Sequence, residues 1–480
     1  MSSRGIPTPV LVDVSAFFPQ GIMAPCLVKA STAASALVLV ERLHGRSEWC
    51  FADTLRPDPL THRLQTAVAA PDQPALSVVW TAGRGRCVQT QRRVHRGELL
   101  MTVPALAFAS LDGGSSTACA DVSACVEHLE GEADASSIAL VIAVLQHSET
   151  RDLAHALCGV PQAGMQHLEG HTRWRNVSAV LRRMAGLPPS SALGAGSPSD
   201  GAIAEIAQCV HANLHRAQDE QTATRAVGVG LYPAACLLNH SCAPSCCLSW
   251  SDSGRVLHVR AITDVAAGEE LTYSYLAEEQ LYAPFEERAA LLRLVHRFEL
   301  APTAERRAAE LACSGWGGMD DGLAGRARAA IAAAHRATAA ADTTTLRAAL
   351  EALETFISRQ LEGGAVHPFH WLVQEVHAAL LAIGRALDEP RVVAKCALHL
   401  LTAREAALSR GTLHLAALYS AHGSAIHRLL RERQVPQSER SAAANAAVAS
   451  MSAAARIRDC CLGSAHPLTL ATKSALERVR

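Results

Sequence analysis

The stretch from Gly228 to Tyr275 restricts the possible fold more than any other part of the chain. It begins with Gly228-Val-Gly-Leu-Tyr-Pro and continues with an apolar run that ends in Asn239-His240-Ser-Cys242. A β-like segment follows, and the stretch closes with Gly268-Glu-Glu-Leu-Thr-Tyr-Ser-Tyr275. One short motif is weak evidence, but three motifs in this order and at compatible spacing are not explained by chance.

These three segments together resemble a SET domain, and within that superfamily they are most similar to the SET-and-MYND (SMYD-type) protein lysine methyltransferases. The resemblance covers residues 76–300 well and residues 320–480 loosely. It implies an α+β chain, with a SET-type β-fold that has helical insertions, followed by an all-α, TPR-like C-terminal domain. It also implies transfer of a methyl group from S-adenosyl-L-methionine (SAM) to a target lysine of a histone or non-histone protein.

The length of 480 residues predicts two or three domains, because a single hydrophobic core does not grow to that size. We expect an N-terminal extension of unknown role over residues 1–75. A SET domain follows over residues 76–300, with a helical insertion at about 130–220 and a post-SET-like helix. A helical domain over residues 320–480 completes the chain.

Local patterns predict the main elements of the SET region. Leu76–Trp80 and Glu98–Val103 are apolar runs bounded by Gly and Pro, as short strands are. Ser136–Leu145 is an apolar stretch of helix formers and predicts a buried helix. Ile203–Ala217 and Phe285–Val295 have the spacing of amphipathic helices.

The C-terminal third is rich in Ala, Leu and Arg, and helix-breaking positions such as Gly363-Gly364, Pro390 and Gly463 divide it into helix-length segments. Helix pairs of this length are typical of a TPR-like array. The turn at Leu462–Leu468 resembles the Gly-x-x-His-Pro-Leu turn of the family's last repeats. An alanine-rich helical spacer would give the same composition, so both interpretations stand at this point.

Composition excludes several classes of partner. The formal net charge of −1 gives no basic field for direct nucleic-acid binding, and no apolar stretch is long enough to span a bilayer. The 15 cysteines include no C-x-x-C pair and follow no secretory signal, which predicts reduced thiols rather than a disulfide framework. We therefore expect a monomer in the cytoplasm, the nucleus or both.

The resemblance assigns SAM binding to Asn239 and His240. The alternative is a purely structural role, in which the two side chains are buried and make the hydrogen bonds needed where strands cross closely. Asn213 lies where the family has an asparagine before its Gly-x-Gly-Leu-Tyr-Pro segment, although His215 replaces the usual aromatic residue. Asn213 is accordingly a predicted SAM contact, with a helix-end polar residue as the alternative.

The first SAM-binding segment of the family is a glycine-rich turn before a strand ending in Gly-Glu. Arg84, Gly85 and Arg86 align with that turn. Glycine allows close approach of the backbone to the cofactor, and an arginine can pair with its methionine carboxylate. These three residues are therefore predicted to bind SAM, although Cys87 stands where the family commonly has a second glycine.

Tyr275 matches the tyrosine after Gly-Glu-Glu-Leu and is the predicted catalytic residue. Its hydroxyl can orient the lysine amine and contact the polarised methyl group through a weak C–H···O interaction. Tyr273 and Phe298 are predicted to line the substrate channel, because Tyr273 shares a strand face with Tyr275 and Phe298 matches the family's post-SET aromatic pair.

Two metal modules of the family have no counterpart in the sequence. The region of the MYND zinc module holds only Cys119 and Cys125, and no cysteine lies between Phe298 and Cys313 to join Cys242 on a post-SET zinc. We therefore predict no metal site and consider zinc unlikely. The loss leaves open a catalytically inactive SET-fold or helical-repeat binding scaffold as the competing function.

Overall fold

The computed structural model describes the backbone of the N-terminal strands within residues 9–57. It also describes residues 76–81, 85–111, 120–129, 133–157, 166–192, 197–221, 225–296, 300, 321–340, 342–362, 366–407 and 411–480. The chain divides into two compact units, Met1–Tyr273 and Ser274–Arg480. The segment that follows Tyr273 is therefore grouped with the helical unit.

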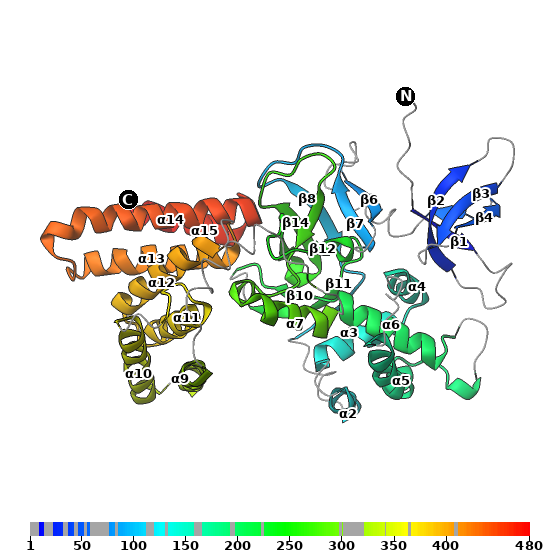
Figure 1. Ribbon diagram of the computed structural model, residues 1–480, viewed down its shortest axis with the longest axis horizontal. Coiled ribbons are helices and arrows are strands. Elements are labelled where there is room, and N and C mark those ends of the chain that lie inside the picture. The colour runs from blue at the N-terminus through cyan, green and yellow to red at the C-terminus, as the bar shows by residue number, and fades with distance from the viewer. Residues whose placement is uncertain are drawn as a thin grey trace. The chain divides into compact units, whose positions relative to one another are not determined.

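The N-terminal extension, for which the sequence predicts no role, forms a five-stranded antiparallel sheet. Four of its strands are labelled in Figure 1. The first four strands pair in sequence order, and the fifth strand pairs with the first at the other edge of the sheet. The sheet order is β4-β3-β2-β1-β5. The strands are β1 (Pro9–Asp13), β2 (Met23–Ser31), β3 (Leu37–Arg42), β4 (Ser47–Phe51) and β5 (Leu55–Pro57).

Among the residues that the structure describes, three small sheets make up the β part of the SET region. Their orders are β10-β11-β9, β12-β15-β7-β6 and β13-β14-β8, so each sheet joins segments that are far apart in the sequence. The strands predicted at Leu76–Trp80 and Glu98–Val103 are present as β6 and β8. The strands are β6 (Leu76–Thr81), β7 (Gly85–Thr90), β8 (Leu99–Pro104), β9 (Ala107–Ser110), β10 (His215–Gln218), β11 (Ala226–Leu231), β12 (Asn239–His240), β13 (Cys246–Ser251), β14 (Val256–Ala261) and β15 (Glu270–Tyr273).

The insertion between β9 and β10 is helical, and helix α3 packs against β9 and β11. The predicted buried helix is confirmed as α3, in which Ile138, Leu140 and Val141 are fully buried. The Asp134 side chain caps its first turn by accepting from the Ser137 amide at 2.8 Å. The helices are α2 (Ala120–His128), α3 (Ala135–Leu145), α4 (Ser148–Leu157), α5 (Gln166–Met184) and α6 (Asp200–Asn213).

The sequence prediction for α6 was too long at its C-terminal end. Apolar spacing predicts helix as far as Ala217, but α6 ends at Asn213 and the chain continues as strand β10. The pairing of β10 with β11, which aligns His215 with Gly230, uses backbone groups that a longer helix would have kept for itself. Sheet pairing therefore decided where the helix ends.

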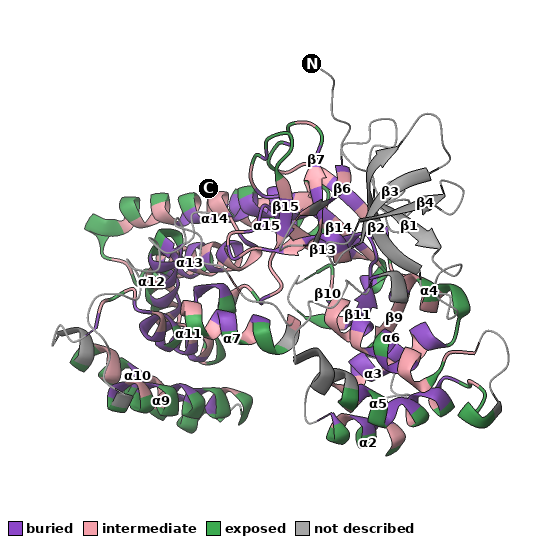
Figure 2. Ribbon diagram, turned by 45° about the vertical axis from the view of Figure 1, so that its right-hand side comes forward, coloured by how far each residue is buried: buried purple, intermediate pink, exposed green. Residues whose placement is uncertain are grey.

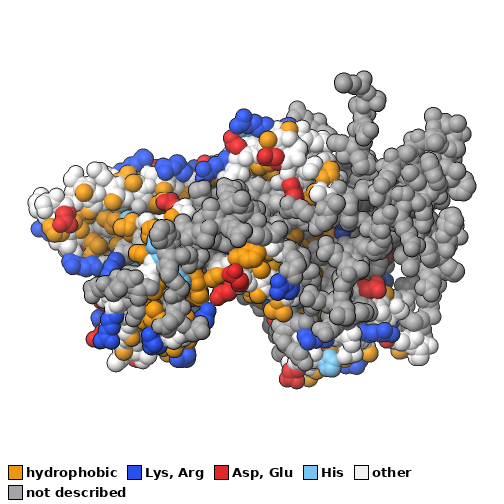
Figure 3. Space-filling view, in the orientation of Figure 1, with side chains coloured by type: hydrophobic (Ala, Val, Ile, Leu, Met, Phe, Trp, Pro, Cys, Tyr) orange, Lys and Arg blue, Asp and Glu red, His pale blue; other side chains and the backbone are white. Residues whose placement is uncertain are grey.

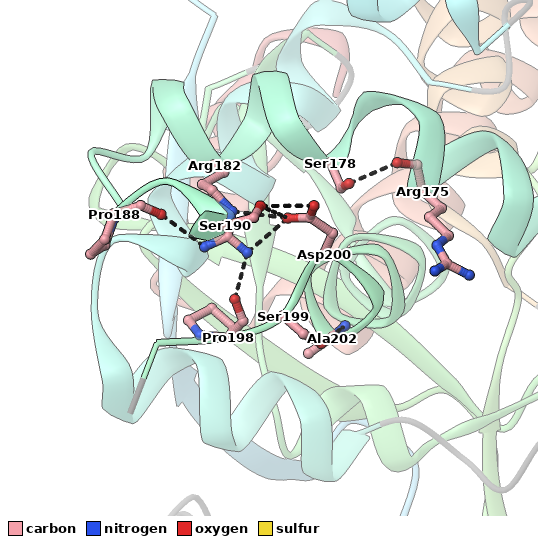
Figure 4. A network of polar contacts seen from close by, with 9 residues as sticks. All are labelled: Arg175, Ser178, Arg182, Pro188, Ser190, Pro198, Ser199, Asp200 and Ala202. Carbon is pink, nitrogen blue, oxygen red and sulfur yellow. Dashed lines mark hydrogen bonds and ion pairs between the residues drawn. The ribbon is translucent and has the colours of Figure 1, made fainter. Parts of the chain in front are cut away.

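A buried arginine joins the end of α5 to the start of α6 (Figure 4). The Arg182 side chain is 4% exposed and forms an ion pair of 2.7 Å with Asp200. It also donates to the carbonyl oxygens of Pro188 and Pro198, at 3.0 and 2.6 Å. Burial alone would raise the pKa of Asp200, but hydrogen bonds from Arg182 and Ser190 outweigh it and lower the pKa. This stabilisation is present above the ordinary carboxyl pKa and is lost as pH falls through the folded-state value.

We expect Arg182→Met to lower the free energy of unfolding by about 3 kcal/mol, because it removes the charged partner of Asp200 and the donor to two carbonyl groups. The neighbouring variant Arg183→Met is the control. Its ion pair with Asp121 is exposed, so its loss should cost less than about 1 kcal/mol. Urea unfolding followed by tryptophan fluorescence measures both, since Trp174 is buried on α5. Equal effects of the two variants would contradict a structural role for the buried network.

The second unit is helical, and consecutive helices pack against one another from α9 to α15 (Figure 1). Buried residues follow the facing sides of α11 to α14 (Figure 2). The C-terminal region is therefore all-helical, with its helices packed in sequence order as a TPR-like array would have them. The elements are η5 (Glu279–Tyr282), α7 (Phe285–His296), α9 (Asp321–Ala340), α10 (Thr343–Glu362), α11 (Trp371–Ala386), α12 (Pro390–Ala407), α13 (Leu413–Arg431), α14 (Arg440–Leu462) and α15 (Pro467–Val479).

Small residues and turn chemistry set this helical packing. A Cβ at Gly423 of α13 would lie 2.8 Å from Cγ of Met451 on α14, so glycine allows these two helices to approach closely. Gly463 ends α14 with a positive φ of 94°, and the His466 side chain caps α15 by accepting from the Leu468 amide. The predicted Leu462–Leu468 turn thus connects the last two helices.

The described residues on the face shown in Figure 3 are chemically mixed. On the face shown in Figure 3, Lys and Arg side chains are scattered among acidic and uncharged ones instead of forming one continuous basic patch. Within the described ranges, no helix combines the length and the apolar character needed to cross a membrane.

Candidate functional site

Three sequence motifs lie side by side in one sheet of the first unit. Strand β12, which is the Asn239–His240 pair, runs parallel to β15, with Asn239 beside Thr272 and His240 beside Tyr273. Strand β15 pairs in turn with β7, the strand that begins at Gly85. The Asn-His motif, the Gly-Glu-Glu-Leu motif and the glycine-rich turn therefore meet, as the resemblance requires.

Asn239 connects these three strands through its side chain. Its amide nitrogen donates to the Arg86 carbonyl oxygen on β7 at 3.1 Å and to Oε1 of Glu270 on β15 at 2.8 Å. Both bonds use the nitrogen, so the amide is oriented and its oxygen is the atom that can accept from a ligand. Glu270 was missed as a site residue, although it is part of the Gly-Glu-Glu-Leu motif.

His240 is buried beside Cys242 of its own motif. Its side chain lies with Nε2 3.3 Å from Sγ of Cys242, and the two residues are 7% and 8% exposed. The backbone amide of Ser241 donates to the Tyr273 carbonyl oxygen at 2.9 Å, which extends the contact between the motif and β15. The segment is thus held by backbone and side-chain contacts together.

The glycine-rich turn is only partly described. Arg84 lies outside the described residues, and Gly85 begins β7 opposite Thr81. The Arg86 side chain donates from Nη2 to the carbonyl oxygen of Leu157, the last residue of α4, at 2.8 Å. This bond satisfies a carbonyl group that the helix itself leaves unpaired, so Arg86 has a structural role in addition to its predicted one.

Asn213 ends α6 and is joined to the segment that leads to Asn239. Its amide nitrogen donates back to the Cys209 carbonyl oxygen at 2.9 Å, as the helix-end alternative predicts. Its own carbonyl oxygen accepts from Sγ of Cys236 at 3.3 Å. Burial raises the pKa of Cys236 to about 12, which keeps the thiol protonated and able to donate.

Tyr273 packs against a histidine in place of the aromatic residue that the family usually has. The rings of Tyr273 and His215 are stacked with centroids 5.5 Å apart, and the tyrosine hydroxyl lies 3.1 Å from Nε2 of His215. A second ring, that of Tyr232, is in edge contact with His215, with centroids 5.6 Å apart. The imidazole thus fills an aromatic position and also orients the Tyr273 hydroxyl.

Tyr275 belongs to the second unit, two residues beyond Tyr273 along the chain. Its ring centroid is 4.6 Å from that of His296, at the end of α7. Half-burial of Tyr275 leaves part of the side chain accessible. Phe298, the other predicted channel residue of this part, lies outside the described residues.

Within the described part of the chain, no group of three or more His, Cys, Asp or Glu side chains could hold a metal ion. Cys242 contacts His240, and burial raises the pKa of Cys246 to about 12, which disfavours the thiolate that zinc binds. The absence of zinc remains a prediction.

Comparison with known proteins agrees with this geometry. Residues 85–276 match the model of the SET domain, so this part of the chain is a SET domain. The chain is similar to the histone-lysine N-methyltransferase SMYD3 of Mus musculus and of Homo sapiens, with 47% identity over 73 residues. It is also 26% identical over 163 residues to the N-lysine methyltransferase SMYD2-B of Danio rerio. The resemblance to SMYD-type proteins is thereby confirmed.

These matches cover part of each protein. The aligned residues are 15% of this chain and 16% of either SMYD3, and 34% of this chain and 35% of SMYD2-B. A crystal structure of the SET domain of LSMT, bound to lysine and AdoHcy, aligns with 88% of this chain and 92% of that one. Its TM-score is 0.30 at 11% sequence identity.

Proposed function

We propose that this chain is a SAM-dependent protein-lysine N-methyltransferase that acts on a histone or non-histone protein. The observation that carries the proposal is the position of Asn239, which is oriented by β7 and β15 with its amide oxygen left to accept from a cofactor. The methyltransferase activity of the named relatives supports the same class of reaction. A target lysine in a protein is accordingly the proposed partner, in the cytoplasm or nucleus, without direct binding of nucleic acid.

The residues of the SET unit fit such a cofactor chemically. The amide oxygen of Asn239 suits the charged amino group of the methionine part, and His240 lies next to it on the same short strand. Gly85 carries no side chain, so the backbone at the start of β7 can lie close to the ligand. Asn213, Arg84 and Arg86 complete the proposed SAM-binding set.

When bound, SAM supplies an electrophilic methyl group for in-line transfer to the lysine amine. The protein has to position the amine, favour its neutral form by burial and exclude water. The Tyr275 hydroxyl is proposed to orient the amine by hydrogen bonding. It is a poor general base, because a free phenol titrates near pH 10. Tyr273, whose ring is held by His215, and Phe298 are proposed to line the lysine channel.

We expect the metal-free protein to bind SAM and its demethylated product, S-adenosylhomocysteine, with one site per chain. Isothermal titration calorimetry on chelator-treated protein measures this directly, and elemental analysis of the same sample reports bound zinc. Absence of binding at millimolar SAM would overturn the enzyme proposal. Stoichiometric zinc would overturn only its metal-free part.

A binding scaffold without catalysis is the second candidate. It is favoured by the hydrogen bonds that already occupy the amide nitrogens of Asn213 and Asn239 inside the protein. The same titration separates the two functions, because a scaffold of this kind has no need for SAM. Absence of SAM binding in the folded protein would favour the scaffold.

A further inference from the structure

The segment that carries Tyr275 is bound to the helical array inside the second unit. Both carboxylate oxygens of Glu278 lie at the first turn of α13, where Oε1 accepts from the Leu413 amide at 3.2 Å and Oε2 accepts from the His414 amide. The Thr412 hydroxyl caps the same helix by accepting from the Leu415 amide at 3.3 Å. Glu278 thus satisfies two amides that the helix leaves unpaired, and its negative charge suits the helix N-terminus.

Local hydrogen bonds order the short segment that contains Tyr275 and Glu278. The Ser274 hydroxyl accepts from the Leu276 amide at 3.1 Å and donates to the Leu276 carbonyl oxygen at 2.9 Å, which closes a tight turn around Tyr275. The Ala277 amide donates to Oε1 of Gln280 at 3.0 Å, and the Leu281 amide donates to the Glu278 carbonyl oxygen. A displacement of Glu278 would therefore move the turn that presents the tyrosine.

Two further contacts hold the same segment. The guanidinium carbon of Arg404, on α12, lies 4.6 Å from the ring centroid of Tyr282, and both residues are buried. At the other end, the ring of Tyr275 rests on His296 of α7. Tyr275 thus lies in a hydrogen-bonded turn and contacts a helix of the same unit through its ring.

We propose that Glu278 is a positioning residue for Tyr275, and that its carboxylate on the first turn of α13 fixes the orientation in which the tyrosine meets the lysine amine. This inference rests on the proposed methyltransferase function. It adds that the helical domain acts on the chemical step through this one carboxylate. A small displacement of a reacting group is enough to slow an in-line transfer strongly.

The test compares Glu278→Ala with Thr412→Ala in the full-length chain, because both changes remove a cap from the same helix end and only the first touches the Tyr275 turn. We expect Glu278→Ala to lower kcat about 10-fold, with KM and the Kd for SAM changed less than about 2-fold. Thr412→Ala should lower the melting temperature without changing kcat. Glu278→Gln should recover part of the rate, since its amide oxygen can still accept from one amide.

A double-mutant cycle connects the effect to the tyrosine. In a Tyr275→Phe background, Glu278→Ala should lower kcat less than about 2-fold, because residues that act through one group are not additive. Full additivity of the two changes, or equal losses of kcat in Glu278→Ala and Thr412→Ala, would overturn the inference.

Amide hydrogen exchange supplies a readout that needs no activity. Exchange over residues 274–284 should be faster in Glu278→Ala than in wild type, and unchanged in Thr412→Ala. Unchanged exchange in Glu278→Ala would overturn the inference even in an active enzyme. If wild type transfers no methyl group while this exchange pattern is observed, the proposed function fails and the structural link from Glu278 to Tyr275 stands.

Discussion

Replacing Tyr275 with phenylalanine is expected to lower kcat for methyl transfer about 30-fold, with little change in SAM affinity. The hydroxyl is proposed to make one hydrogen bond to the lysine amine and one weak contact to the methyl group, together worth about 2 kcal/mol in the transition state. Phenylalanine keeps the ring that packs on His296, so the fold should not change. Single-turnover kinetics, with enzyme in excess over the protein substrate and SAM saturating, measure the chemical step directly.

Tyr419→Phe is the matched control for this prediction. Its hydroxyl bonds to Glu405 within the helical array and is assigned no part in the reaction. The control should transfer methyl groups at the wild-type rate. Wild-type kcat in Tyr275→Phe would show that Tyr275 serves in packing alone, and a large loss of SAM affinity would place it at the cofactor instead of the amine.

Asn239→Ala is expected to weaken SAM binding about 30-fold, because a hydrogen bond to a charged group contributes about 2 kcal/mol. The same change should lower the free energy of unfolding by about 1–2 kcal/mol, since the Arg86 carbonyl and the Glu270 carboxylate lose their common donor. Calorimetric titration and urea unfolding separate the two effects.

Asn445→Ala is the control, because Asn445 is exposed on α14 and the substitution there removes no buried bond. It should leave both SAM affinity and the unfolding midpoint as in wild type. Asn239→Ala could instead destabilise the protein and still bind SAM normally. In that case the Asn-His pair has a structural role where strands cross, which is the alternative to cofactor binding that the sequence leaves open.

Local sequence patterns predicted most elements of the SET region. Strands β6 and β8 and the buried helix α3 follow from apolar runs and their Gly or Pro boundaries, which act over a few residues. The end of α6 could not be predicted in this way. The residues after Asn213 have helical spacing, and only their pairing with β11 makes them a strand.

The candidate site was likewise predicted only in part from the sequence. The motifs around Asn239, His240 and Tyr275 identify the domain from residue types and order alone, because each motif is contiguous. The partners of these residues were not predictable from the sequence. His215, for example, appears there only as a departure from the family pattern, and the structure places it stacked on Tyr273.

The sequence by itself therefore determined the class of domain, the helical character of the C-terminal region and the candidate residues for cofactor and lysine. Only the tertiary structure decided which groups orient them. Glu270 bonds to a residue 31 positions away, and Glu278 bonds to an amide 135 positions away. Spacing along a chain encodes the local period of a helix or strand, whereas such distant partners depend on how the completed elements pack.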